Sequence, residues 1–253
     1  MSTASIVLVL SRAAFDVVLF DLDGVITQTA KVHVAAWEAM FNDYLKRMAD
    51  LSGEPYRPFD PDSDYRRYVN GRPRYEGVKS FLAARGITLP YGKPSDPPEQ
   101  ETVCGLGNRK NKLFLAFLKK GKLAVYPTTL DLIRQLRSKR FRIAVVSASE
   151  NCGPILEAAH IADLFEVRVD GLDIARLPLK GKPAPDTFLE AARRLAVAPK
   201  RAVVVEDAIA GVEAGRAGRF GCVIGVDRTG HPEALKEAGA DVVVQDLAEI
   251  GVE

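Results

Sequence analysis

Short runs of β-branched and apolar residues recur along the chain, and helical stretches separate most of them. Runs of this length, each bounded by turn or polar residues, are typical of buried strands. Strands that alternate with helices favour a parallel, doubly wound sheet with helices on both faces, so the sequence predicts an α/β fold. The predicted strands are residues 15–20, 142–146, 165–169, 201–205, 221–226 and 241–244, and the predicted helices include residues 128–138, 154–160 and 185–195.

The pattern changes between residues 30 and 122. This segment contains amphipathic helices, such as residues 33–48 and 110–119, without convincing strands, and Pro- and Gly-rich connectors interrupt it. A chain of 253 residues is long enough for a core and an inserted subdomain. We therefore expect an α/β core formed by residues 1–29 and 123–253, interrupted by an all-helical insertion at residues 30–122.

Composition narrows the choice of partner and compartment. The net charge is +2 with both signs scattered, which gives no footprint for nucleic acid or an anionic membrane. The three cysteines form no Cys-x-x-Cys pair, so we expect neither a disulfide framework nor a zinc site. We expect a cytoplasmic location, where cysteines stay reduced. The apolar run at residues 6–10 is shorter than a signal-peptide core of roughly 7–15 residues and far below the ~20 residues that span a bilayer. No role is assigned to residues 1–12.

Polar residues follow several predicted strands, at the edge where open parallel sheets bind ligands. Asp21 and Asp23 follow the first strand, and alternation along an extended segment lets them share a face. Ser147 follows another strand, and Glu206 with Asp207 follows a third. Lys182 lies in a loop just ahead of a predicted helix. Each of these polar residues alone could belong to a solvated turn, a helix cap or a loop. All of them in this order along the chain favour a catalytic site.

The residue types suit phosphoryl transfer. One carboxylate can attack phosphorus, and the other can carry a proton to or from a hydroxyl group. Asp21 and Asp207, with Glu206 nearby, offer hard oxygen ligands for Mg²⁺, and Gly24 lets the backbone turn close to the ligand. Lys182 and the Ser147 hydroxyl can hold the transferring phosphoryl oxygens.

With these motifs the sequence resembles the haloacid dehalogenase-like phosphotransferase superfamily. The matching pieces are Asp21-Leu22-Asp23-Gly24-Val25, Ser147, Lys182 in Gly-Lys-Pro-Ala-Pro-Asp, and Glu206-Asp207. The resemblance implies a Rossmann-like core in which Asp21 is the nucleophile, Asp23 is the general acid/base, and Ser147 and Lys182 stabilise the phosphoryl group. It also implies Mg²⁺ held by Asp21, the backbone carbonyl of Asp23 and Asp207, with Glu206 close to the metal. The helical insertion resembles the cap of this superfamily.

Within the superfamily the sequence is most similar to the β-phosphoglucomutase branch. The likeness rests on residues 20–27, on Thr29, His33 and Trp37, on Tyr126-Pro127, and on Ser147-Ala148-Ser149-Glu150-Asn151. It implies that His33 lies near the site, that Arg74 clamps the non-reacting phosphate with Ser149 and Asn151, and that Lys110 faces the substrate. In the alternative interpretation His33 and Trp37 simply pack on one helix face, and Arg74 and Lys110 are solvated charges.

We therefore expect a Mg²⁺-dependent enzyme that interconverts β-D-glucose 1-phosphate and glucose 6-phosphate through an aspartyl phosphate and a bisphosphate. The alternative is a sugar-phosphate phosphatase, because both reactions pass through the same aspartyl phosphate. A phosphorylatable signalling receiver is disfavoured by motif order, and a dehalogenase would have no use for the proton shuttle at Asp23. The expected partner is a sugar phosphate, without nucleic acid or membrane, and the expected state is a monomer.

Overall fold

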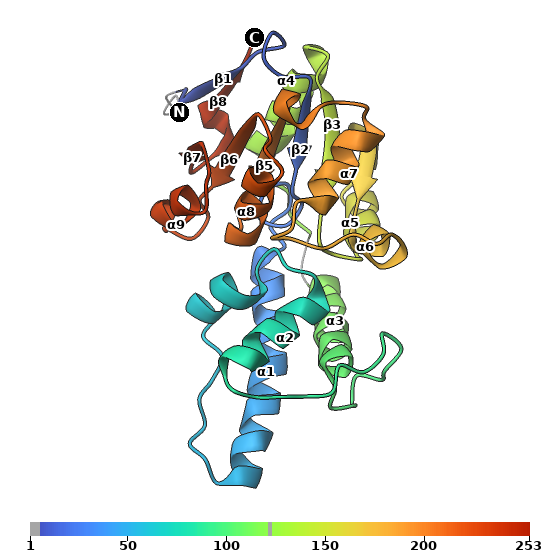
Figure 1. Ribbon diagram of the computed structural model, residues 1–253, viewed down its shortest axis with the longest axis vertical. Coiled ribbons are helices and arrows are strands. Elements are labelled where there is room, and N and C mark those ends of the chain that lie inside the picture. Colours follow the sequence, from blue (N-terminus) through green and yellow to red (C-terminus); the bar gives the residue numbers. More distant parts are fainter. Residues whose placement is uncertain (1–5, 121–122) are drawn as a thin grey trace. The chain divides into compact units, whose positions relative to one another are not determined.

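The computed structural model describes residues 6–120 and 123–253 (Figure 1). The chain divides into two compact units, one formed by Met1–Gln28 with Leu123–Glu253 and the other by Thr29–Lys122. The first contains a parallel sheet with helices and is termed the α/β unit. The second is termed the helical unit, because its described residues form helices and connectors without strands.

A six-stranded parallel sheet with the order β4-β3-β2-β5-β6-β7 organises the α/β unit. The central strand β2 (Val17–Phe20) pairs with β3 (Arg142–Val146) on one side and β5 (Ala202–Glu206) on the other. The chain winds from β2 to β3 and β4, then returns to β5 on the opposite side of β2. Ligands of open α/β sheets bind beyond the strand ends at such a reversal. The outer strands are β4 (Val167–Val169), β6 (Cys222–Val226) and β7 (Val242–Val244).

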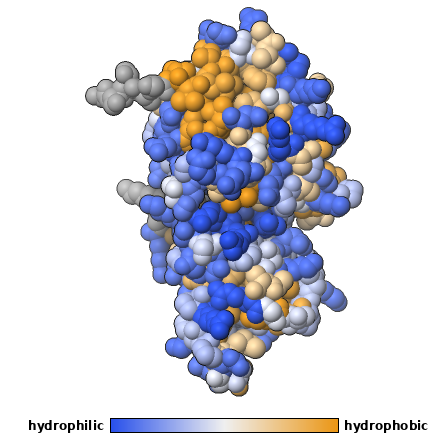
Figure 2. All heavy atoms as spheres, turned by 60° about the vertical axis from the view of Figure 1, so that its left-hand side comes forward, coloured by the Kyte–Doolittle hydropathy of each residue, from blue (hydrophilic) through white to orange (hydrophobic). Residues whose placement is uncertain are grey.

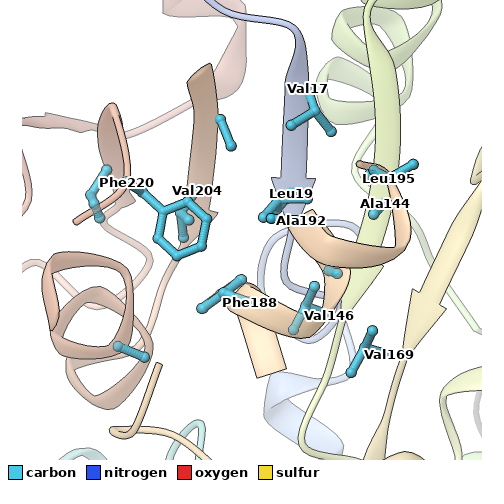
Figure 3. Packing of buried hydrophobic residues seen from close by; sticks show 14 of the residues in the cluster. Val17, Leu19, Ala144, Val146, Val169, Phe188, Ala192, Leu195, Val204 and Phe220 are labelled. Carbon is cyan, nitrogen blue, oxygen red and sulfur yellow. The ribbon is translucent and has the colours of Figure 1, made fainter. Parts of the chain in front are cut away.

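Alternation along the strands builds the core. Val17 and Leu19 of β2 are fully buried in the same hydrophobic cluster as Val146 of β3 and Phe188 of α7, as Figure 3 shows. Residues two apart on a strand point to one face, so a short apolar run supplies a packing surface for a helix. The helices of this unit are α4 (Pro127–Ser138), α5 (Cys152–Ala158), α6 (Gly171–Arg176), α7 (Asp186–Arg194), α8 (Ile209–Ala217) and α9 (Pro232–Glu237), with short turns at Ala162–Leu164, Pro199–Arg201 and Leu247–Glu249.

The predicted doubly wound parallel fold is confirmed, and each of the predicted strands overlaps an observed one. The apolar run at residues 6–10, which had no assigned role, contributes β1 (Leu8–Leu10). This strand pairs in parallel with β8 (Ile250–Val252) to form a separate two-stranded sheet. Leu10 is fully buried, whereas Ile6, Val7 and Val9 are about half exposed. Figure 2 shows that the face it draws carries a patch of hydrophobic residues.

The described residues of the helical unit form four helical segments. Aromatic packing fills its interior: the ring of Phe41 lies 4.1 Å from that of Phe81 and 5.3 Å from those of Trp37 and Phe59, measured between centroids. The predicted helices at residues 33–48 and 110–119 lie inside longer ones. The segments are α1 (Ala30–Ser52), a π-helix at Tyr65–Val69, α2 (Arg74–Ala84) and α3 (Val103–Lys120).

None of the helices in the described ranges combines the length and the hydropathy that crossing a membrane requires.

Candidate active site

Three carboxylates meet at the carboxyl ends of the central strands β2 and β5. The backbone N–H of Asp21 donates to the Val205 carbonyl at 2.9 Å and continues the β2–β5 pairing by one residue. Because Phe20 pairs with Val205, Asp21 lies level with Glu206, the last residue of β5. Asp21, Glu206 and Asp207 each offer one carboxylate oxygen, and these oxygens lie within 4.8 Å of one another.

Lys182 lies between two of these carboxylates. Its Nζ atom donates to Asp21, lies 2.6 Å from Glu206 Oε1, and donates to the Val146 carbonyl at 3.0 Å. The ring of Phe188 covers it at 4.8 Å, and only 2% of the residue is exposed. The loop that carries Lys182 leads directly into α7, whose Phe188 belongs to the sheet core. The sheet, the loop and the helix therefore fix the ammonium group from several directions.

The electrostatics of the cluster follow from its burial. Burial raises the pKa of Asp21 well above its ordinary value, and Lys182 opposes this rise while Glu206 and Asp23 add to it. Burial, together with Glu206 and Asp21, also raises the pKa of Asp207 well above its ordinary value. Burial alone would lower the pKa of Lys182, but Asp21 and Glu206 outweigh it and raise that pKa. Several buried carboxylates with one ammonium group between them make a site that favours a further cation.

Asp23 and Gly24 form a tight turn beside the carboxylates. The Gly24 N–H donates to the Thr27 carbonyl at 2.8 Å, and Asp23 and Thr27 form an isolated β-bridge. Gly24 has a φ of +85°, and a Cβ atom at this position would lie 2.1 Å from Asp207 Oδ2. Glycine is therefore required twice, for the left-handed backbone and for the contact with Asp207. Asp23 is partly buried, and its charge contributes to the raised pKa values of Asp21 and Asp207.

The loop after β3 contains the predicted serines. Ser147 is buried and directly follows Val146, whose carbonyl accepts from Lys182. Its Oγ accepts from the Ser149 N–H at 3.1 Å, and the Ser149 Oγ accepts from the Asn151 N–H at 3.1 Å, just before α5 begins. The hydroxyls thus shape the entry to α5, a structural role that the same side chains can combine with binding a phosphate.

The other predicted substrate contacts lie in the helical unit. Lys110 of α3 is 4% exposed, and its Nζ atom lies 2.6 Å from Nδ1 of His33 on α1. The ring of His33 stacks on Phe114 at 4.1 Å, and Nζ lies 4.9 Å from the ring centroids of both Trp37 and Phe114. The structure therefore brings His33 and Lys110 together, and Lys110 is not a solvated charge.

Arg74 is the first residue of α2. Its guanidinium carbon lies 4.9 Å from the Tyr75 ring centroid, and it donates to the Tyr75 hydroxyl at 3.2 Å. The Tyr75 hydroxyl in turn donates to Asn108 Oδ1 on α3 at 2.9 Å. These contacts tie the start of α2 to α3, and the partly buried guanidinium group lies at that junction.

Sequence reasoning missed Gly211, which shapes the site through Glu206. A Cβ atom at Gly211 of α8 would lie 1.8 Å from Glu206 Oε1, so any larger residue would displace this carboxylate. Glu206 Oε2 accepts from the Ala208 N–H at 3.0 Å, which turns the side chain back toward α8. The available signal was a glycine five residues after a candidate ligand.

Comparisons with known proteins identify the family of this chain. Residues 15–219 match the family model described as haloacid dehalogenase-like hydrolase. Beta-phosphoglucomutase of Mycobacterium tuberculosis is 46% identical over 235 residues, which are 92% of this chain and 90% of the relative. Beta-phosphoglucomutase of Bacillus subtilis is 34% identical over 237 residues, 93% of this chain and 92% of the relative.

A solved structure, beta-phosphoglucomutase from Clostridium difficile, superimposes with a TM-score of 0.70 at 26% identity, over 93% of this chain and 92% of that one. The family match covers most of the chain and includes the carboxylates, Lys182 and Ser147. The relatives match nearly their whole length, so the likeness is not confined to one shared segment. The chain therefore belongs to the haloacid dehalogenase-like hydrolase family and is an enzyme of its phosphotransferase kind.

Proposed function

We propose that this enzyme is a Mg²⁺-dependent phosphoglucomutase that interconverts β-D-glucose 1-phosphate and glucose 6-phosphate through an aspartyl phosphate and a sugar bisphosphate. The observation that carries the proposal is the position of Asp21. Its carboxylate is held by Lys182 at the winding reversal of the sheet, within 4.8 Å of the Glu206 and Asp207 oxygens. Relatives at 46% and 34% identity that bear the mutase name support the choice of substrate.

Each side chain then has a role. Asp21 attacks phosphorus, and Lys182 stabilises the charge on the transferring phosphoryl group together with the Ser147 hydroxyl. Asp23 gives a proton to the departing sugar oxygen and takes one from the sugar hydroxyl that attacks the aspartyl phosphate. Arg74, Ser149 and Asn151 bind the phosphate that does not react, and His33 and Lys110 contribute to binding the sugar phosphate.

The donor set of the acidic cluster fits Mg²⁺. Asp21, Asp207 and Glu206 supply carboxylate oxygens, and we propose that the Asp23 carbonyl adds another ligand. The raised pKa values of Asp21 and Asp207 reflect burial and crowded negative charge, which a divalent cation would relieve. When bound, Mg²⁺ would neutralise the repulsion between the carboxylates and the incoming phosphate.

A phosphatase is the second candidate, and the hydrolase description of the family model favours it. Its chemistry would use the same Asp21, Asp23 and Lys182, with water in place of the sugar hydroxyl. The two reactions differ in how well the aspartyl phosphate is protected from water during transfer.

One assay separates the candidates. Purified protein is incubated with β-D-glucose 1-phosphate, Mg²⁺ and a trace of glucose 1,6-bisphosphate, and glucose 6-phosphate and free phosphate are followed in parallel. Formation of glucose 6-phosphate with little free phosphate supports the mutase. Release of phosphate without isomerisation would make the protein a phosphatase. If neither product forms, the sugar is wrong, and a panel of phosphorylated sugars identifies the substrate class.

A further inference from the structure

Arg228 lies in the loop after β6 and belongs to none of the motifs considered above. Its side chain is 15% exposed. It donates from Nε to the Gly24 carbonyl and from Nη1 to the Gln245 carbonyl, both at 3.0 Å. Its guanidinium carbon lies 3.7 Å from the centroid of the Tyr126 ring. Arg228 therefore joins three segments that are far apart in the sequence: the turn after Asp23, the start of α4 and the segment after β7.

The carbonyl that Arg228 holds belongs to the turn that contacts Asp207. The Gly24 N–H donates to Thr27 and its carbonyl accepts from Arg228, so both backbone polar groups of Gly24 are fixed. Asp23 directly precedes this residue and is bridged to Thr27. Rotation of the peptide after Gly24 would therefore disturb the backbone of Asp23 and the close contact between Gly24 and Asp207.

The stacking on Tyr126 fixes the same turn from a second side. Tyr126 donates its N–H to the Ile26 carbonyl at 2.9 Å, and the Gln28 N–H donates to the Ala124 carbonyl at 2.8 Å. An antiparallel bridge joins Thr27 and Val125 between these bonds. Residues 24–28 and 124–126 thus form a short ribbon, and Arg228 holds one strand through Gly24 and the other through Tyr126.

Burial of the Arg228 guanidinium group lowers the stability of the fold, which a purely structural contact would not require. Its Nη2 atom is buried without a hydrogen-bond partner among the described residues, and Nη1 lies 4.0 Å from the Asp246 carboxylate. An unmet donor on a buried cation reduces stability. A planar guanidinium can stack on a ring and donate in its own plane at once, which fixes orientation in a way that an ammonium group cannot.

We propose that Arg228 is a positioning residue that fixes the Gly24 turn and thereby holds Asp23 in place for proton transfer. This inference rests on the proposed role of Asp23 as the general acid and base. It concerns the steps that need a proton, and it leaves the attack of Asp21 on a donor with a good leaving group largely unaffected.

The test uses Arg228→Lys, which keeps the charge and loses the planar group. Two rates are measured at saturating Mg²⁺, so that a changed affinity of the proposed metal ligands Asp207 and the Asp23 carbonyl limits neither of them. They are phosphorylation of Asp21 by acetyl phosphate, and conversion of β-D-glucose 1-phosphate to glucose 6-phosphate. We expect the conversion to fall by about 10- to 100-fold, because a displaced catalytic group loses much of its effect. Phosphorylation of Asp21 should change by less than about threefold, because its leaving group needs no proton. Arg134→Lys on α4, where the side chain is 64% exposed, is the matched control and should change neither rate.

Equal loss of both rates, or loss of neither, would overturn the inference. If Arg228→Lys does not fold, Tyr126→Leu removes the stacking partner and Tyr126→Phe keeps it, and only the first should slow the conversion. If the wild-type enzyme forms phosphorylated Asp21 but no glucose 6-phosphate, the proposed substrate fails, and hydrolysis of the phosphorylated Asp21 replaces the second rate. Hydrolysis needs the same proton transfer, so slower hydrolysis in Arg228→Lys supports the inference and unchanged hydrolysis contradicts it.

Discussion

Two lysine side chains are buried in the described part of the chain, one in each unit, and their surroundings differ in kind. Lys182 of the α/β unit lies between the carboxylates of Asp21 and Glu206. Lys110 of the helical unit lies beside the His33 ring nitrogen and near the faces of two aromatic rings. The first lysine belongs to a cluster of charges, and the second is surrounded by aromatic packing.

The contrast shows how differently each charge is tied to the fold. Without its ammonium group, Lys182 would leave two buried carboxylates facing each other, which is among the most destabilising changes that a single substitution can make. An apolar side chain of similar length at Lys110 would still pack against Trp37 and Phe114. The charge of Lys182 therefore serves both stability and chemistry, whereas the stem of Lys110 packs near aromatic rings that a Met side chain would also contact.

The largest expected effect is that of Lys182→Met. Activity should fall to background, and the free energy of unfolding should fall by roughly 3–5 kcal/mol, because one partner of a buried ionic cluster is lost. Denaturant unfolding and the glucose 6-phosphate assay measure the two effects. The exposed Lys180 of the same loop provides the control Lys180→Met, which should leave both quantities unchanged. If Lys182→Met were as stable as Lys180→Met, the claim that the charge of Lys182 stabilises the fold would be wrong.

Gly211→Ala tests the same cluster without removing a charge. The added Cβ would lie 1.8 Å from Glu206 Oε1 and must push this carboxylate away from Lys182. We expect activity to fall by about 100-fold and the Mg²⁺ concentration for half-maximal activity to rise, because catalytic groups shift. Gly215→Ala in the same helix meets only valine methyl groups, the nearest at 3.0 Å, and should keep the Mg²⁺ requirement of the wild type.

Lys110→Met tests the buried lysine of the helical unit. The free energy of unfolding should fall by about 1–3 kcal/mol, because the Met side chain keeps the packing of the lysine stem but loses the hydrogen bond between Nζ and His33 Nδ1. Activity should fall by about tenfold or more if Lys110 contacts the substrate. Lys112→Met, where the side chain is 71% exposed, is the control on the same helix. A loss of stability as large as that of Lys182→Met would remove the distinction between the two lysines.

The smallest expected effect concerns Glu190, whose carboxylate is not one of those in the candidate active site. Hydrogen bonds from Arg193 and Arg194 lower the pKa of Glu190 to about 2, below its ordinary value of 4.5. Because the folded pKa is lowered, the stabilisation is present above about pH 4.5 and is lost as the pH falls toward 2. Glu190→Gln should therefore narrow the gap between the free energies of unfolding at pH 7 and pH 3. The exposed Glu213→Gln should leave that gap as wide as in the wild type.

Local patterns explain why much of the fold was predictable. The runs at residues 142–146 and 201–205 are β-branched, apolar and bounded by polar residues, and they appear as β3 and β5 within one residue. The aromatic residues that pack in the helical unit recur at helical spacing in α1, which made that helix visible. The residues Asp21, Lys182, Glu206 and Asp207 come together because each follows a strand or precedes a helix at one edge of the sheet.

Contacts between distant segments explain what the sequence left open. Residues 8–10 of the apolar N-terminal run pair with residues 250–252, and no local pattern identifies a partner so far along the chain. Gly211 and Arg228 act through the space and the hydrogen bonds that they provide to Glu206 and Gly24. The substrate-binding roles of four residues stay predictions: His33, Arg74, Ser149 and Asn151. Of the variants proposed above, Lys110→Met changes a contact of His33.

The central claim is that Asp21 carries the phosphoryl group. The most direct measurement incubates the enzyme with Mg²⁺ and acetyl phosphate, quenches it rapidly, and locates the added phosphate by peptide mass spectrometry. The account predicts phosphate on the peptide that contains Asp21, released when β-D-glucose 1-phosphate is added, and no phosphate or turnover in Asp21→Asn. Phosphate on another residue, or normal turnover in Asp21→Asn, would contradict it.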